Sequence, residues 1–138
     1  MLNFFTKKKE IIENPITKIA ALLIHAAKID ENYTNKEREI IRKAIIELGA
    51  DEEKIDNILI EAEEIEKKSN QILDFTKEVK NMEENNKIKI VKTLWKIIFS
   101  NKKADIYEAN LMRRLAGLLY IDSKIMGDIK EQIKKENS

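Results

Sequence analysis

Residues 16–29 read ITKIAALLIHAAKI, and residues 88–100 read IKIVKTLWKIIFS. Both stretches have helical periodicity but are apolar on most sides, whereas an ordinary surface helix carries a single apolar stripe. They are therefore predicted to be two buried central helices. Two further stretches carry one apolar stripe each and are predicted to cover the central pair; the stripes are Ile40, Ile41, Ala44, Ile45, Leu48 and Leu111, Met112, Leu115, Leu118, Leu119.

The rest of the chain also favours helices. Its 138 residues include three glycines and one proline, which are too few to favour a fold built from strands and tight turns. Capping residues set the expected helix starts, because short polar side chains at the N-cap accept backbone N–H bonds. We expect an all-α bundle of about seven helices: from Asn14-Pro15 to about 29, 34–48 before Gly49, from Asp51 to about 67, from Ser69 through NQILDFTKEVKNM, 86–100, from Asp105, and from Asp122 or Ser123.

Composition excludes several classes of function. There is no cysteine and only one histidine, so thiolate sites and multi-histidine metal sites are excluded. The net charge of +1, from 26 basic and 25 acidic residues, does not favour nucleic-acid binding. No apolar run is long enough to span a membrane and no signal peptide is recognisable, so a cytoplasmic location is expected. We expect one domain over residues 1–138, with a short N-terminal segment at 1–14.

An internal repeat runs through the chain. At an offset of 71 residues, and without a gap from about 18 to 62, the first three main helices resemble the last three. The matches fall at caps and core positions: Lys18 with Lys89, Ile19 with Ile90, Leu23 with Leu94, Glu37 with Glu108, Arg42 with Arg113, Leu48 with Leu119, Asp51 with Asp122 and Ile58 with Ile129. We infer two three-helix units, about 15–67 and 86–136, related by a pseudo-twofold axis and joined by a connector helix.

The turn KIDENYTNKEREII, residues 28–41, allows two interpretations. Thr34-x-x-Glu37 has capping-box spacing, in which each side chain accepts a backbone N–H of the other residue, and Asp105-x-x-Glu108 repeats it. Alternatively, Asp30, Asn32 and Thr34 occupy alternate positions, as the first ligands of a calcium loop do. Asn35 stands where such a loop has glycine, and Ile41 where it has glutamate, so the turn is not an EF-hand.

The repeat and its inter-helix turns resemble the tellurite-resistance TerB family and its relatives, which include the N-terminal domain of the co-chaperone DjlA. The resemblance lies in AKIDENYTNKERE (27–39), QILDFTKEV (71–79) and LWKIIFSNKKADIYEANLMRRLAGLL (94–119), and covers about residues 16–133. The chain looks most like the family's small single-domain branch. In the family, the turn reads Ala-Asp-Gly and occurs twice. Here the glycine is replaced by Glu31 in the first turn and by Lys102 in the second, and the aspartate of the second turn is replaced by Asn101.

The resemblance implies an all-α fold and a non-enzymatic interaction or scaffold module, linked to tellurite or chemical stress. It also implies a divalent-metal site at Asp30 and Glu37, with Asn101 and Glu108 by repeat symmetry; the calcium-like pattern adds Asn32. A divalent-metal-binding protein is therefore the second hypothesis, and an enzyme of unknown chemistry is the third. No cofactor other than a divalent cation is expected. A protein partner or a homodimer is expected.

The remaining candidates have simple structural explanations. His25, on the first central helix, is predicted to be a satisfied or rim residue, and Trp95 and Phe99 to be core residues. A basic edge is expected to pair with the glutamates of the third helix, or else to bind an anion. The edge comprises Lys89, Lys92, Lys96, Arg113 and Arg114, and the glutamates are Glu61, Glu63, Glu64 and Glu66. The apolar N-terminal residues are predicted to pack on the bundle or on a second copy, with membrane-surface contact as the alternative; they are Leu2, Phe4 and Phe5.

Overall fold

The computed structural model describes residues 15–29, 33–69, 72–100 and 106–136. These ranges contain seven α-helices and no strand, as the sequence predicts: α2 (Pro15–Ala27), α3 (Asn35–Glu47), α4 (Ile55–Lys68), α5 (Leu73–Lys80), α6 (Glu84–Ser100), α7 (Ile106–Leu118) and α8 (Ser123–Glu136). None of these helices is long and apolar enough to cross a lipid bilayer.

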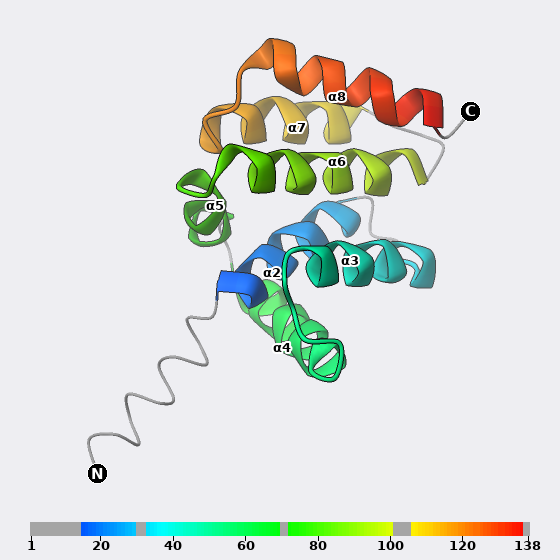
Figure 1. Cartoon of the computed structure of the whole chain (residues 1–138), viewed down its shortest axis with the longest axis vertical. Helices are drawn as coiled ribbons and strands as arrows, with labels where there is room; N and C mark the ends of the chain where they lie inside the picture. The colour runs from blue at the N-terminus through cyan, green and yellow to red at the C-terminus, as the bar shows by residue number, and fades with distance from the viewer. Residues whose placement is uncertain (1–14, 30–32, 70–71, 101–105, 137–138) are drawn as a thin grey trace.

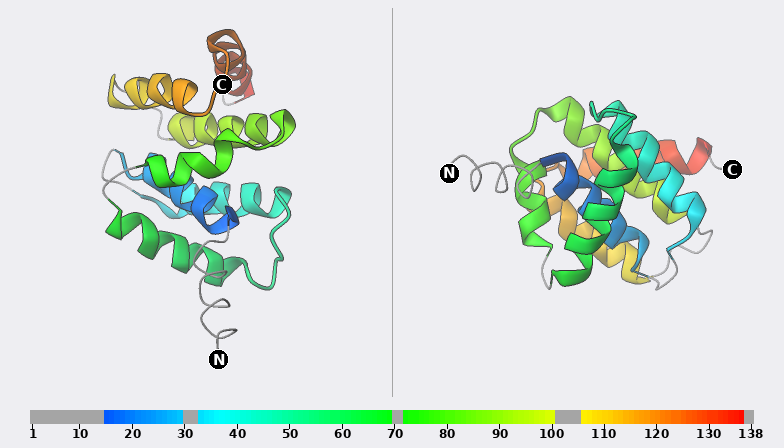
Figure 2. Two further views of the ribbon diagram at one scale, coloured as in Figure 1. Left: turned by 90° about the vertical axis from the view of Figure 1, so that its left-hand side faces the viewer. Right: turned by 90° about the horizontal axis from the view of Figure 1, so that it is seen from below.

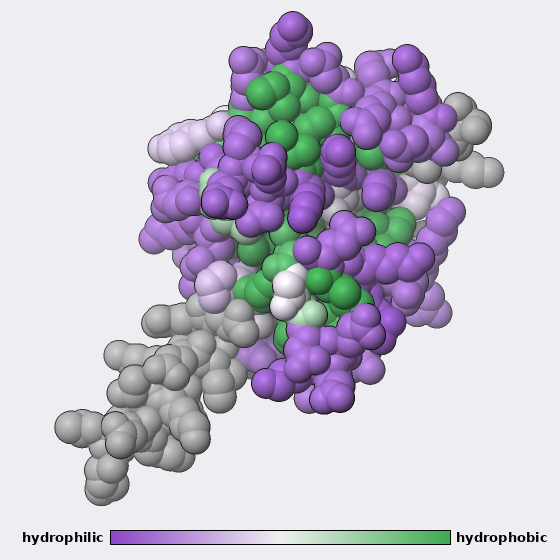
Figure 3. Space-filling model, in the orientation of Figure 1, coloured by the Kyte–Doolittle hydropathy of each residue, from purple (hydrophilic) through white to green (hydrophobic). Residues whose placement is uncertain are grey.

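The helices form two halves. Helices α2, α3 and α4 lie in one half and α6, α7 and α8 in the other, with α5 between them at one end (Figures 1 and 2). Contacts of α6 with α2 and α3 join the halves, and α5 contacts both α2 and α7. Hydrophilic side chains cover most of the face in Figure 3, where apolar residues gather over α7–α8 and over the α2–α3 region.

Helices α2 and α6 are the buried central pair that the sequence predicts. Leu22 and Leu23 of α2 and Leu94 of α6 have no exposed surface, and most other residues of both helices are also buried. Each such leucine contributes roughly 1.5–3 kcal/mol by leaving water. The single stripes of the neighbouring helices also reach the core, through Ile41 of α3 and Leu115 of α7.

The start of α3 confirms the predicted capping box, but two other predicted caps are wrong. Asp51 does not cap α4: its carboxylate accepts the N–H of Glu53 at 3.0 Å, which forms a turn before the helix begins at Ile55. Ser69 is the C-cap of α4 and not the N-cap of α5, which begins at Leu73. A polar residue that opens a turn looks the same in sequence as one that caps a helix.

The turns that end α3 and α7 repeat each other at the predicted offset of 71. The N–H groups of Gly49 and Ala50 donate to the carbonyls of Ile46 and Ile45 at 3.0 and 3.1 Å. After α7, the N–H groups of Tyr120 and Ile121 donate to the carbonyls of Gly117 and Ala116 at 3.3 and 2.9 Å. Each central helix also contacts the third helix of its own unit, α4 or α8. The pseudo-twofold axis itself stays a prediction.

Candidate functional site

The predicted metal turn can be assessed at one residue only. The carboxylate of Glu37 is buried and accepts the backbone N–H of Thr34 at 2.8 Å, while the Thr34 hydroxyl accepts the N–H of Glu37 at 3.1 Å. Asp30, Asn32 and Asn101 lie outside the described residues, as does the side chain of Glu108. Within the described ranges, no three acidic or histidine residues form a group that could hold a metal. The metal role therefore stays a prediction.

Charged groups on α4 hold α2 and the start of α3 in place. The carboxylate of Glu66 is buried and lies 2.7 Å from the Lys28 ammonium and 3.2 Å from His25 Nδ1. Glu63 accepts from the Tyr33 hydroxyl and from Arg38 Nε, both at 3.1 Å. His25 is thus a satisfied residue, as predicted. A buried carboxylate with two such partners stabilises the α2–α4 contact.

The expected pairing of the basic edge with Glu61, Glu63, Glu64 and Glu66 is wrong for the residues that the structure describes. Glu63 and Glu66 pair with groups of the first unit, and Glu64 pairs with Lys68 on the same helix at 3.9 Å. Arg113 instead donates to Asn110 Oδ1 at 3.2 Å on its own helix. Glu63 and Glu66 face α2 and the start of α3, because α4 packs against those helices.

Tyr33 and Arg38 are the two groups near Glu63 whose pKa is shifted. Burial raises the pKa of Tyr33 well above its ordinary value, and the charge and hydrogen bond of Glu63 raise it further. Burial acts to lower the pKa of Arg38, but the hydrogen bond and charge of Glu63 outweigh it and raise that pKa. Tyr33 therefore stays a neutral hydroxyl and Arg38 a cation over the physiological range.

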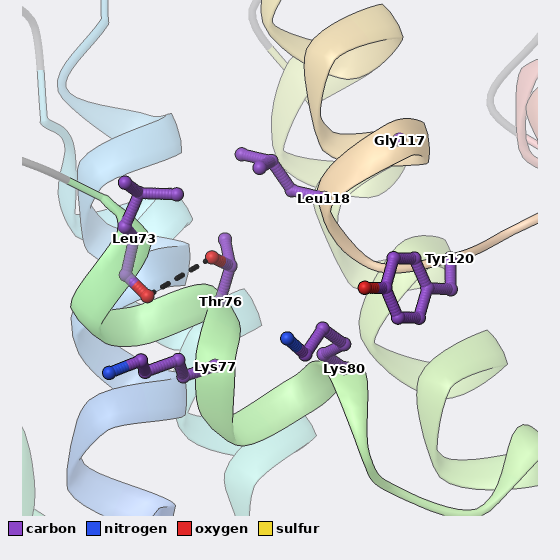
Figure 4. A pocket seen from close by; sticks show the side chains of 7 residues that line it. All are labelled: Leu73, Thr76, Lys77, Lys80, Gly117, Leu118 and Tyr120. Carbon is purple, nitrogen blue, oxygen red and sulfur yellow. Dashed lines mark hydrogen bonds between the residues drawn. The ribbon is translucent and has the colours of Figure 1, made fainter.

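A pocket of about 230 Å³ lies between α5 and the end of α7. We call it the α5–α7 pocket; it is lined by Leu73, Thr76, Lys77, Lys80, Gly117, Leu118 and Tyr120. Figure 4 shows Leu118 pointing across to α5 and the Tyr120 ring beside the end of that helix. The Lys80 ammonium is 5.3 Å from the centre of the Tyr120 ring, which is cation–π distance. Leu73 is 43% exposed and Tyr120 is 69% exposed.

Tyr120 has an unusual backbone. Its φ of 58° lies in the left-handed region, and it is the one non-glycine residue with positive φ in the described part of the chain. The corresponding turn after α3 has Gly49 at this position, with a φ of 109°. A residue with a side chain costs roughly 1 kcal/mol in this conformation, and such strain is often kept at functional sites. Tyr120 was not predicted as a site residue from the sequence, although the offset of 71 pairs it with Gly49.

The comparisons with known proteins agree with the resemblance and the fold. No curated protein and no solved structure matches the chain significantly. Residues 17–131 match the family model described as "Tellurite resistance protein TerB", and this match covers most of the chain. The all-α fold that the resemblance implies is the fold observed in the described residues. The chain belongs to the TerB family.

Proposed function

We propose that this chain is a non-enzymatic interaction module that binds a protein partner at the α5–α7 pocket. The observation that supports this most is Tyr120, an exposed aromatic side chain in a backbone conformation suited to glycine. Glycine would fit the turn better, so folding alone does not explain a tyrosine there. Tyrosine is also among the side chains that dominate binding energy at protein interfaces.

The charges around the pocket indicate the chemistry of the partner. Lys77 and Lys80 line it, and among the described residues no carboxylate pairs with either of them. Two copies meeting through this surface would bring these lysines together, which is unfavourable. The proposed partner is therefore a different protein, with an apolar side chain for the Leu73–Tyr120 surface and carboxylates for the lysines.

The titratable groups also favour binding over catalysis. The carboxylates of Glu37, Glu63 and Glu66 all hold structural contacts. Tyr33 has a raised pKa that is unsuited to proton transfer near neutral pH. Family membership supports a cytoplasmic role in tellurite or chemical stress, with the module acting as a scaffold.

The test compares partner capture by three forms of the protein in cells that make it. Tyr120→Gly removes the ring from the pocket and leaves a turn that glycine adopts without strain. Ile60→Ala is the matched control, because Ile60 is another large apolar side chain, 56% exposed, on α4. We expect one acidic protein to be captured by the wild type and by Ile60→Ala, and lost or weakened about tenfold or more with Tyr120→Gly. Equal capture by all three forms would contradict the proposal.

A further inference from the structure

A second, larger groove lies between α6, α7 and α8. Its volume is about 410 Å³, within the range of roughly 300–1,000 Å³ typical of small-molecule sites. We call it the tryptophan groove, because Trp95 of α6 lines it. It shares no lining residue with the α5–α7 pocket, so it requires an explanation of its own.

The floor of the tryptophan groove is apolar and adaptable. Trp95, Met112 and Met126 line it, and all three are at least nine-tenths buried. Methionine adapts its shape to an aliphatic chain more readily than branched side chains do. Small residues leave the space open: a Cβ added at Gly127 would meet nothing within 4 Å.

Two cations lie at the groove on different helices. Lys130 of α8 places its ammonium 5.5 Å from the centre of the Trp95 ring, and Arg113 of α7 lines the groove as well. Arg113 contacts the neutral Asn110, and no carboxylate pairs with Arg113 or Lys130 in the part of the chain that the structure describes. The positive charge at this apolar groove is therefore not neutralised within those residues.

Trp95 also carries a buried polar group. Its indole N–H is buried and has no acceptor within the described structure. Buried polar groups in proteins almost always have a hydrogen-bond partner, so each exception requires an explanation. This N–H has almost no exposed surface, so a ligand in the groove would contact it only if the indole ring turned. The feature that indicates an anion is therefore the pair of cations, Arg113 and Lys130.

We infer that the tryptophan groove binds an aliphatic carboxylate. The chain of the ligand lies along Trp95, Met112 and Met126, and its carboxylate lies between Arg113 and Lys130. The single cavity suits a small molecule better than a helix, which needs a row of anchor sites along a groove. The N-terminal segment of the protein is a poor occupant, because Lys7, Lys8 and Lys9 would be repelled by the same two cations.

The test uses the fluorescence of Trp95, which is the only tryptophan in the chain. Monomeric dodecanoate is titrated into the full-length protein beside dodecanol and dodecyltrimethylammonium, which have the same chain with a neutral or positive head. We expect a saturable fluorescence change with dodecanoate, and binding at least roughly tenfold weaker for the other two. Equal binding of dodecanol and dodecanoate would overturn the inference, because the cations would then have no role.

Variants separate binding from folding. Lys130→Gln and Arg113→Gln should each weaken dodecanoate binding by roughly tenfold, whereas Arg114→Gln is the matched control, exposed beside Arg113 but outside the groove. Gly127→Leu should fill the groove and abolish binding while the melting temperature is kept, because the added side chain meets open space. Lys130→Gln binding no more weakly than Arg114→Gln would contradict the inference.

An anionic lipid also joins an aliphatic chain to a negatively charged head. A vesicle experiment therefore distinguishes a membrane surface from a free carboxylate. We expect no binding of the protein to phosphatidylglycerol vesicles under conditions that saturate it with dodecanoate. Binding to vesicles without binding to monomeric dodecanoate would assign the groove to a membrane surface and overturn the inference.

Discussion

Two residues, Gly49 and Tyr120, occupy equivalent turns but suit them unequally. Both have positive φ and both donate to the carbonyl three residues earlier. Glycine adopts this conformation without a steric cost, whereas a tyrosine loses about 1 kcal/mol. The Lys80–Tyr120 contact, at 5.3 Å, returns roughly 0.5 kcal/mol of this.

Substituting these two residues should therefore have different effects on the free energy of unfolding. Gly49→Ala should lower the free energy of unfolding by about 1–2 kcal/mol, because its φ of 109° strains any side chain, although the surrounding space is open. Tyr120→Gly should leave it unchanged or raise it by up to about 0.5 kcal/mol, since relief of strain exceeds the lost cation–π contact. Urea unfolding of both variants measures this. A clear loss of stability in Tyr120→Gly would show that the tyrosine has a structural role.

Particular residues decide which features of the fold and of the sites can be predicted from the sequence. The central helices were predictable because residues 16–29 and 88–100 are apolar on too many sides for a surface. The α3 cap was predictable because the capping box is local. The two sites were not: the α5–α7 pocket joins residues 73 and 120, and the tryptophan groove joins three helices. Only the packing of helices brings such residues together.

At the level of elements, α4 is fixed to its neighbours by polar contacts as well as by apolar packing. Glu66 receives Lys28 and His25 from the end of α2, and Glu63 receives Tyr33 and Arg38 from the start of α3. Helix α4 thus contacts the described residues on both sides of the predicted metal turn, through Lys28 before it and Tyr33 and Arg38 after it.

The raised pKa of Tyr33 makes this contact sensitive to alkaline pH. The folded protein holds the phenol proton more tightly than the unfolded chain, whose tyrosine pKa is about 10. The contribution of Tyr33 is therefore fully present below pH about 10 and is lost as the pH rises above it. Tyr33→Phe should destabilise the protein near neutral pH by about 1 kcal/mol, and this difference should shrink above pH about 10. Urea unfolding at several pH values measures it, and a difference independent of pH would contradict it.

The metal hypothesis is tested on the turn between α2 and α3. Under that hypothesis, Ca²⁺, Mg²⁺ or Mn²⁺ should stabilise the chelated protein by about 2.7 kcal/mol at a hundredfold excess over the dissociation constant. Asp30→Ala should abolish the resulting rise in melting temperature, whereas Asn101→Ala tests the second turn separately. No rise with any of the three metals would leave Glu37 with its capping role alone.

At the scale of the whole molecule, α7 takes part in two separate surface sites. The connector α5 contacts α7 and forms the α5–α7 pocket at the junction of the two halves. The tryptophan groove lies wholly within the second unit, between α6, α7 and α8. The two sites share no lining residue, so the proposed partner and the proposed ligand would occupy different surfaces.

Site-specific crosslinking in cells tests the interaction surface most directly. A photoreactive amino acid is placed at Lys77, which is exposed and lines the α5–α7 pocket, and in a second form at Ile60 of α4 as the control. We predict a discrete crosslinked protein from position 77 that is absent from position 60, and that disappears when Tyr120→Gly is added. The same crosslinks from both positions, or a position-77 product that survives Tyr120→Gly, would contradict a partner-binding role for this surface.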